Sequence, residues 1–223
     1  MQPFIAVTTT RIFCRPGCPA RAPRADHVRH YDTPEAALAD GFRPCLRCRP
    51  LGDGLVVAAT LDTPLGPMLA AATDDGVCLL EFTDRRMLPT QLEIVERRLG
   101  RIVPGRHAHL ERLHEQLDAY FAGDLRDFSV PLAAPGSPFE QAVWRELRTI
   151  PAGETRSYDG LAFSLGRPGA ARAVGRANGM NRIAIVIPCH RVIGADGSLT
   201  GYGGGLWRKR RLLDLERGAV ASD

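Results

Sequence analysis

Four cysteines in the first fifty or so residues constrain what this part of the chain can fold into. Cys14 and Cys18 are separated by three residues, and Cys45 and Cys48 by two. Paired spacings of this kind let each pair bind one side of a tetrahedral Zn²⁺ ion. A segment this short buries little apolar core, so a bound metal would supply stability that packing cannot. The spacing therefore predicts a zinc module.

Two disulfides, or four unrelated thiols, are the alternatives for these cysteines. The first residues, Met1 to Ile5, lack the charged and apolar regions of a signal peptide. No apolar run approaches the roughly 20 residues needed to cross a bilayer. These features predict a cytoplasmic protein without a membrane partner, where thiols stay reduced, and they favour zinc over both alternatives.

Basic residues are concentrated at the N-terminus. The formal net charge is +4, and residues 1–50 contain eight arginines against four acidic residues, so this segment accounts for all of it. Lys209 is the only lysine in the chain. Arginine binds phosphate through two parallel hydrogen bonds, which is compatible with an anionic partner. A high genomic GC content would produce the same bias toward arginine.

A closed four-cysteine zinc site is normally structural, but its sulfurs are also electron-rich. With four thiolates the site carries a net charge of −2, and alkylation of one thiolate changes it to −1. Neighbouring arginines would then bind DNA phosphate with less opposing charge. These arginines are Arg11, Arg15, Arg43, Arg47 and Arg49.

Residues 53–134 have the pattern of a small α/β unit. Apolar runs flank the turn signal Thr63–Pro67, and a helical apolar periodicity follows them. Cys78 lies within an apolar run and is interpreted as a core strand residue. Strands are expected at 56–61, 68–72 and 76–82, and helices at about 89–99 and 109–122. The histidines interpreted as ordinary surface residues are His107, His109 and His114.

Residues 135–223 are predicted to be mostly helical. Ser137 and Glu140 form a capping box with Pro138 at the first helical position, which opens a helix that stops before Pro151. Two short helices separated by Gly166-Arg167-Pro168 fit a helix-turn-helix. These helices are expected at about 158–165 and 168–178, and a last helix at about 207–218. The segment Leu51-Gly52-Asp53-Gly54 is interpreted as a linker.

A cysteine directly precedes a histidine in the segment Ile187-Pro188-Cys189-His190-Arg191-Val192. Only a few per cent of a thiol with a pKa of about 8.5 is ionised at neutral pH, so a neighbouring base would activate Cys189. For an isolated pair the structural interpretation is the commoner one: a buried cysteine at the end of a strand formed by Ile183–Ile187, beside a hydrogen-bonded histidine. The residues on both sides of the pair favour the reactive interpretation.

Two parts of the chain resemble known families. Thr9–Ala20 and Gly41–Cys48 resemble the zinc module of Ada-type DNA alkylation-repair proteins, in which the cysteine matching Cys14 accepts a methyl group from a DNA methylphosphotriester. Residues 56–223 resemble the O6-alkylguanine-DNA alkyltransferases, whose acceptor motif matches PCHRV. The resemblance implies an α/β fold in three parts. These are an Ada-type zinc-binding module at 1–52, a ribonuclease H-like α/β subdomain at 53–134, and a mostly helical catalytic and DNA-binding domain with a helix-turn-helix at 135–223.

The resemblance also implies catalytic roles. Cys189 would accept the alkyl group from O6 of guanine, and His190 would take the thiol proton through a water molecule. Glu216 matches the acid that orients this histidine; a solvent-facing partner of Arg210 or Arg211 is the alternative. Asn181 matches the asparagine that braces the active-site turn, where Arg182 follows in place of the proline of many alkyltransferases.

Three further residues match positions that contact the DNA or the extruded base. Tyr158 matches the tyrosine beside the flipped base, which can help protonate the departing guanine. Arg172 matches the arginine inserted where that base was stacked, and a solvated surface arginine is the alternative. Tyr202 and the glycines after it match the loop that walls the pocket. The small residues of 168–178 suit a minor groove or, equally, close helix packing.

The sequence therefore predicts a single-turnover DNA repair enzyme. It would transfer methyl or small alkyl groups from O6-alkylguanine, and more weakly O4-alkylthymine, in double-stranded DNA to Cys189. Methyl transfer from a methylphosphotriester to Cys14 is the second reaction implied. The protein is expected to be a monomer with one structural Zn²⁺ at Cys14, Cys18, Cys45 and Cys48.

A methylation-responsive DNA-binding regulator or damage sensor is the alternative function. The Cys189-His190 pair argues against pure binding, and the short linker leaves no AraC-type module between the zinc segment and the alkyltransferase segment. A cysteine hydrolase is disfavoured because its two catalytic residues are normally distant in sequence.

Overall fold

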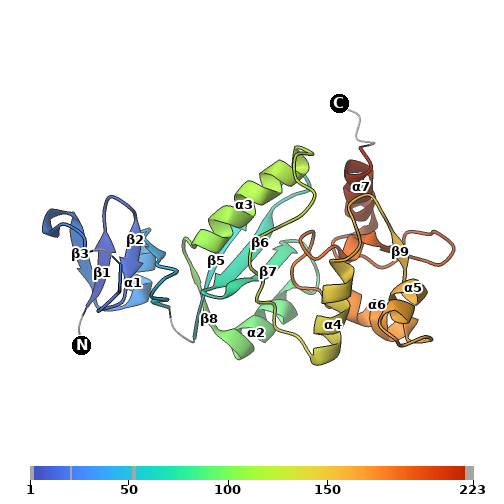
Figure 1. Ribbon diagram of the computed structural model, residues 1–223, viewed down its shortest axis with the longest axis horizontal. Helices are drawn as coiled ribbons and strands as arrows, with labels where there is room; N and C mark the ends of the chain where they lie inside the picture. The colour runs from blue at the N-terminus through green and yellow to red at the C-terminus, as the bar shows by residue number, and fades with distance from the viewer. Residues whose placement is uncertain (1–2, 21, 52–53, 219–223) are drawn as a thin grey trace.

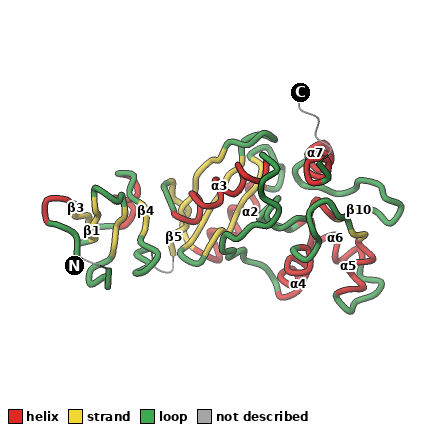
Figure 2. Tube along the Cα trace, turned by 45° about the horizontal axis from the view of Figure 1, so that its top comes forward, coloured by secondary structure: helices red, strands yellow, loops and turns green. Residues whose placement is uncertain are grey.

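The computed structural model describes residues 3–20, 22–51 and 54–218. Three parts follow one another along the long axis of the molecule (Figure 1; Figure 2). A small N-terminal module lies at one end, an α/β subdomain in the middle and a helical part at the other end. Within the described ranges, no helix is long and apolar enough to cross a membrane.

The N-terminal module is built on a short four-stranded sheet that the sequence did not predict. Its strand order is β3-β1-β2-β4, and α1 packs beside it. The Thr33 side chain accepts the backbone N–H of Ala36 and so caps α1. Phe13 and Phe42 are fully buried in its core. The elements are β1 Phe4–Val7, β2 Ile12–Cys14, the 3-10 turn η1 Ala25–His27, β3 Val28–Tyr31, α1 Pro34–Ala39 and β4 Arg43–Pro44.

The middle part is a four-stranded sheet with the order β7-β6-β5-β8. The three predicted strands are antiparallel neighbours, and the unpredicted β8 pairs parallel to β5. The proposed linker residues Gly52 and Asp53 lie outside the described residues, and Gly54 already belongs to β5. The elements are β5 Gly54–Leu61, β6 Met68–Thr73, β7 Gly76–Phe82, α2 Leu88–Leu99, β8 Gly100–Pro104 and α3 Ala108–Phe121.

The two helices cover opposite faces of this sheet (Figure 1). Alternate strand residues face each helix, because successive side chains of a strand point to opposite sides. Val57 and Leu80 share a buried cluster with Leu113 of α3, whereas Val56 and Cys78 share one with Val95 of α2. Cys78 is fully buried in β7, as predicted.

The helical part contains the predicted helices with small shifts. The capping box at Ser137 and Glu140 is present at the start of α4. The second helix of the helix-turn-helix begins at Ala171, three residues later than predicted. The elements are α4 Pro138–Leu147, β9 Arg156–Ser157, α5 Tyr158–Ser164, α6 Ala171–Gly179, the 3-10 turn η2 Cys189–Arg191, β10 Val192–Ile193 and α7 Leu206–Glu216.

The expected strand at Ile183–Ile187 is wrong. The segment makes one isolated bridge to the outer edge of β7, where Leu80 N donates to Arg182 O and Ala184 N donates to Leu80 O, both at 2.8 Å. It then turns, with Ile185 at a φ of 70°. The whole run is buried, and a short apolar run does not reveal whether it is a strand or a buried turn.

Two of the three histidines expected on the surface are buried. His107 is fully buried and His109 is 8% exposed; His114 is exposed as predicted. His107 Nδ1 accepts the backbone N–H of His109 and caps α3, and His107 Nε2 lies 3.6 Å from Asp74 Oδ1. Helical periodicity could not reveal that His107 is buried, because His107 lies before the first residue of α3.

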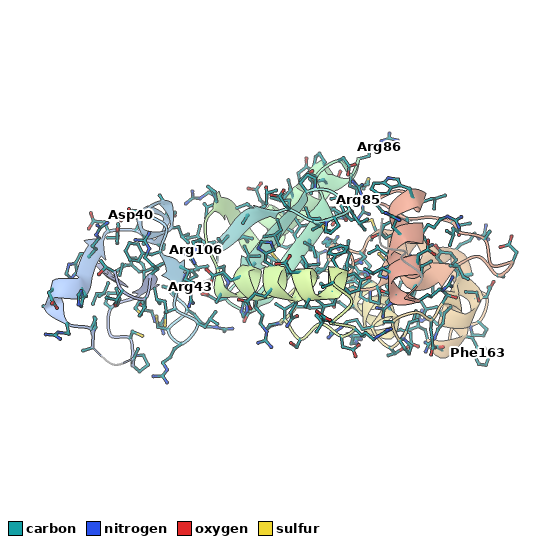
Figure 3. The ribbon with its side chains drawn as sticks, turned by 90° about the horizontal axis from the view of Figure 1, so that it is seen from above. Asp40, Arg43, Arg85, Arg86, Arg106 and Phe163 are labelled. Carbon is teal, nitrogen blue, oxygen red and sulfur yellow. The ribbon has the colours of Figure 1, made fainter. Side chains whose placement is uncertain are left out.

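The N-terminal module is joined to the α/β subdomain by ion pairs and by a shared core. Arg43 Nε lies 3.3 Å from Glu111 Oε2, and Arg49 pairs with Asp75. Arg43 and Arg106 lie at this junction, and Arg106 also pairs with Glu111, at 2.7 Å (Figure 3). Residues from all three parts belong to one buried apolar cluster. The module is therefore packed against the rest of the chain.

Candidate active site and metal centre

Cys189 begins the 3-10 turn η2, directly after the buried turn that β7 anchors. Its side chain is almost inaccessible, with the residue 7% exposed. Burial raises the pKa of the thiol, while a hydrogen bond from Asn181 Nδ2 to Sγ, at 3.1 Å, opposes that shift. The resting thiol is therefore held protonated, and it needs a base to become a nucleophile.

His190 and Glu216 are adjacent although they are far apart in the chain. His190 Nε2 lies 2.7 Å from Glu216 Oε1, and both side chains are buried. The carboxylate can only accept, so Nε2 carries the proton and Nδ1 is left as the basic nitrogen. Burial lowers the pKa of His190, which keeps the ring neutral. A solvent-facing Glu216 paired with Arg210 or Arg211 is thereby ruled out.

Glu216 is the centre of a dense hydrogen-bond network. Arg191 donates to both of its oxygens at 2.9 Å, and Tyr120 OH donates to Oε1 at 2.8 Å. Gly153 N donates to Oε2 at 3.1 Å. Burial alone would raise the pKa of Glu216, but hydrogen bonds from His190 and Arg191 hold it well below its usual range. The acid is therefore charged at neutral pH.

Arg191 and Tyr120 were missed by the sequence interpretation. Arg191 directly follows the Cys189-His190 pair in the sequence, and this adjacency could have indicated that it belongs to the site. Tyr120 is a buried residue of α3 among leucines, and a tyrosine on the apolar face of a helix gives no sign that its hydroxyl reaches a carboxylate. Both side chains hold Glu216 in place beside His190.

Asn181 connects the thiol to the turn before it. Its Nδ2 donates to Ile187 O at 2.8 Å as well as to Cys189 Sγ, and its Oδ1 accepts the N–H of Ile183 at 3.0 Å. The side chain therefore bridges both ends of the Ile183–Ile187 turn. A substitution here would disturb the backbone and the thiol together.

A small cavity of about 10 Å³ adjoins Cys189. That volume holds about one water molecule and is far smaller than a purine. Tyr202 lines the cavity, and its ring centroid lies 6.5 Å from that of His190. The Tyr202 hydroxyl is buried and has no hydrogen-bond partner among the described residues. The cavity is lined by Glu81, Arg85, Asn178, Gly179, Ala184, Cys189 and the loop Gly201-Tyr202-Gly203-Gly204.

Tyr158 and Arg172 occupy the helix-turn-helix. Tyr158 is the first residue of α5, and its hydroxyl donates to Thr200 O at 3.4 Å, next to the glycine-rich loop. Burial raises the pKa of its phenol, so it stays protonated. Arg172 lies in the first turn of α6 and is exposed. The structure thus places Tyr158 near the cavity and Arg172 at the surface.

Lys209 was noted only as the single lysine of the chain, but it is fully buried. Its Nζ donates to the carbonyls of Val192 and Thr200, on either side of the loop that follows Cys189. Burial lowers its pKa to about 8. Glu81 and Arg85, which line the cavity, were also missed, because nothing in the sequence connects β7 with Cys189.

The four N-terminal cysteines converge as predicted. Their sulfur atoms lie within 4.8 Å of one another. Tetrahedral zinc with bonds of 2.3 Å would place sulfurs about 3.8 Å apart, so the cluster has the size required. Burial raises the pKa values of Cys14 and Cys48, the latter to about 11. A bound cation would hold these sulfurs as thiolates at neutral pH.

Comparison with protein families divides the chain in the same order as the structure. Residues 2–51 match the metal binding domain of Ada. Residues 56–134 match the ribonuclease-like domain of 6-O-methylguanine DNA methyltransferase, and residues 138–218 match its DNA binding domain. The cluster capable of binding a metal ion thus lies inside the matched metal binding domain.

Curated relatives and solved structures agree with these matches. A methylated-DNA–protein-cysteine methyltransferase of Mycolicibacterium paratuberculosis is 51% identical over 158 residues, which are 71% of this chain and 90% of the relative. One from Methanosarcina acetivorans is 44% identical over 71% of this chain and 96% of its own length. The crystal structure of the Mycobacterium tuberculosis protein OGT in complex with DNA has 45% identity and a TM-score of 0.64, covering 74% of this chain and 94% of its own. The chain therefore belongs to the methylated-DNA–protein-cysteine methyltransferase family and carries the metal binding domain of Ada ahead of the methyltransferase domains.

Proposed function

We propose that this protein repairs double-stranded DNA by transferring a methyl or small alkyl group from O6 of guanine to Cys189. The observation that carries the proposal is the buried series of contacts from Asn181 to the Cys189 thiol and from His190 to Glu216, beside a cavity walled by a glycine-rich loop. A thiol, a neutral imidazole and a charged orienting acid are the groups that a nucleophilic cysteine requires.

The alkylated base must leave the duplex before Cys189 can reach it, because the reactive carbon is inaccessible in the stack. The exposed Arg172 of α6 is proposed to fill the space that the base leaves. Tyr158 lies next to the glycine-rich loop and Tyr202 lies within it, and both are proposed to contact the extruded base. Extrusion costs a few kcal/mol, which DNA contacts of the helix-turn-helix would offset.

In the transfer itself, His190 accepts the thiol proton, directly or through a water molecule, at Nδ1. The Cys189 sulfur then forms a bond to the alkyl carbon while the bond from that carbon to O6 breaks. The electron pair stays on guanine, which takes up a proton, and Tyr158 is the proposed donor. The product is a thioether that nothing in the described structure could cleave, so each molecule would act once.

The test is transfer from duplex DNA that contains isotopically labelled O6-methylguanine, followed by peptide mass mapping. We expect label on Cys189 at no more than one equivalent, and none on the buried control cysteine Cys78. Cys189→Ser should abolish labelling. Catalytic turnover, or label on another residue, would refute the proposal. A weaker reaction with O4-methylthymine is expected in the same assay.

Methyl transfer from a methylphosphotriester to Cys14 is proposed as a second reaction. Cys14 ends β2 and is partly exposed, as are Cys18 and Cys45, whereas Cys48 is buried and is therefore less accessible to a phosphate methyl group. A bound Zn²⁺ would keep the cysteine sulfurs ionised. Mass mapping after incubation with methylphosphotriester DNA should find the methyl on Cys14, and an unmodified Cys14 would leave the cluster a purely structural one.

We propose that the protein acts as a monomer, because all residues of the Cys189 arrangement come from one chain, and that it acts in the cytoplasm. We propose the division of the chain at residues 52/53 and 134/135 into a zinc module, an α/β subdomain and a catalytic domain. The continuous buried cluster across the three parts supports their working as one unit.

A further inference from the structure

A second buried ion pair lies on the cavity wall, separate from the one at Glu216. Glu81 near the end of β7 pairs with Arg85 four residues later, and both line the cavity that contains Cys189. Glu81 is fully buried, and the Arg85 side chain is 8% exposed. Arg85 lies between the α/β subdomain and α7, whereas its neighbour Arg86 points away from the protein (Figure 3).

Three hydrogen bonds fix the guanidinium. Nη1 donates to Glu81 Oε2 and, at 3.2 Å, to the Asn181 carbonyl. Nη2 donates to the Gly179 carbonyl at 2.6 Å. Nε is buried and has no partner among the described residues. Arg85 therefore reaches the cavity from another subdomain with three of its five N–H groups in use, and Nε–H and the second Nη2–H are left unused.

The glycine-rich loop is shaped to accommodate this side chain. A Cβ on Gly203 would lie 2.5 Å from both Cζ and Nε of Arg85, so any side chain there would collide with the guanidinium. The loop thus covers Nε closely. Because a purine cannot fit in about 10 Å³, its entry requires the loop to withdraw, which would uncover the unused donor.

Activation of the thiol does not explain Arg85. The charge of Glu81 raises the pKa of Cys189 and the charge of Arg85 lowers it, so the two charges oppose each other at the sulfur, where burial has the larger effect. A buried polar hydrogen without a partner is unfavourable. The unused donor is instead available to whatever occupies the cavity during the reaction.

We propose that Arg85 is a specificity-determining and catalytic residue that donates to the O6 and N7 edge of the extruded guanine. Guanine presents two acceptors on this edge, and an arginine donating to both is the commonest specific contact to guanine in protein–DNA complexes. This inference rests on the proposed alkyl transfer to Cys189 and adds a residue that recognises the base.

The same contact assists the bond exchange. As the Cys189 sulfur bonds to the alkyl carbon, the bond from that carbon to O6 breaks and its electron pair remains on O6. A cation beside O6 stabilises that charge most strongly in the transition state. The proton that left the thiol for His190 balances the charge when the guanine ring is reprotonated. Glu81 keeps the guanidinium in position and takes no part in the exchange.

The test compares single-turnover transfer from O6-methylguanine and from 7-deaza-O6-methylguanine, which lacks the N7 acceptor, in the same duplex. We expect the wild-type protein to react about 10-fold more slowly with the 7-deaza substrate. Arg85→Met should react about 10- to 100-fold more slowly with O6-methylguanine and should no longer distinguish the two substrates. The exposed Arg86→Met is the matched control and should behave as wild type.

A structural role alone would slow Arg85→Met equally on both substrates and leave the 7-deaza effect intact, which would overturn the proposal. Wild-type protein that ignores the 7-deaza change would overturn it as well, without depending on how any variant folds. In a Cys189→Ala background, binding to lesion-containing duplex should show the same substrate difference. Absence of transfer by wild type, with that binding difference preserved, would instead count against the proposed function and not against recognition by Arg85.

Discussion

His190 Nε2 lies 2.7 Å from Glu216 Oε1, with neither side chain exposed to solvent. The two residues are 26 positions apart in the chain, and the carboxylate of Glu216 determines which ring nitrogen of His190 carries the proton. The remaining hydrogen-bond capacity of the acid is taken by Arg191, Tyr120 and Gly153. The orientation of the imidazole is therefore determined by α3, η2 and α7 together.

Removing the charge of Glu216 should impair both reactivity and stability. Glu216→Gln would leave Arg191 as a buried charge without its counter-ion, at a cost of about 3–5 kcal/mol in the free energy of unfolding. The rate of transfer to Cys189 should fall by about 10²–10⁴, because the base would lose its orientation. Urea unfolding and single-turnover rates measure the two effects. The exposed Glu115→Gln on α3 is the control, and an equal loss there would contradict this explanation.

Acid should destabilise the protein through His190. Burial lowers the pKa of this histidine below that of the unfolded chain, about 6.5. Below that pH the unfolded state binds the proton more readily, so stability is full above about pH 6.5 and decreases as the pH falls toward the lowered pKa. The slope for one group is at most about 1.4 kcal/mol per pH unit.

The transfer rate should decrease in the same direction, because a protonated imidazole cannot accept the thiol proton. Unfolding free energies between pH 5 and 7.5 should show the slope in the wild type and a smaller one in His190→Asn. An identical slope in the variant would assign the effect to other groups, such as His109, whose pKa burial also lowers.

Metal removal should act on the N-terminal module and largely spare Cys189. Cys48→Ser removes a buried member of the cluster and should abolish stoichiometric zinc, measured by mass spectrometry of the native protein. Proteolysis should then begin within the module, because its small sheet loses its main constraint. Transfer to Cys189 should stay within about 3-fold of wild type, because the N-terminal module and the helical part that contains Cys189 lie at opposite ends of the molecule (Figure 1).

Cys78→Ser is the matched control for this experiment. It also removes a buried thiol, but from the core of β7, so zinc content should be unchanged. Full zinc content in Cys48→Ser would show that the cluster does not need all four sulfurs.

Arg172 should matter for duplex substrates alone. If its side chain replaces the extruded base, Arg172→Ala should slow transfer from duplex O6-methylguanine by about 10- to 100-fold, since extrusion costs a few kcal/mol. Transfer from the free O6-alkylated base should not change. Arg97→Ala, at an exposed position on α2, is the control. An equal loss with the free base would place Arg172 in the pocket instead.

Local signals in the sequence predicted the elements that depend on neighbouring residues. Ser137 and Glu140 specify the start of α4 through reciprocal hydrogen bonds, and the cysteine spacings predicted the cluster that the structure contains. Elements stabilised by distant partners were missed. The short β8 exists because it pairs with β5, and the Ile183–Ile187 turn is fixed by Asn181 and by the edge of β7.

The candidate site shows the same division. The Cys189-His190 pair was visible as a motif. The resemblance added Asn181 and Glu216, and the structure places Asn181 in contact with Cys189 and Glu216 in contact with His190. Arg85 and Tyr120 could not be found this way, because they come from the α/β subdomain and meet the site only through tertiary packing. The buried His107 was misjudged for a related reason: its partner Asp74 lies in a turn 33 positions earlier.

The tight cavity at Cys189 also has a consequence for how long the protein survives after it has reacted. A methyl group on Sγ would occupy space that holds about one water molecule and would weaken the contact with Asn181. Overpacking of this kind costs about 1–3 kcal/mol, which raises the unfolded fraction several-fold or more. Protease digestion before and after one equivalent of substrate should show faster loss of the reacted form, whereas equal lifetimes would show that the site relaxes around the methyl group. Each repaired lesion would then remove one protein molecule from the cell, and the capacity for repair would recover only through new synthesis.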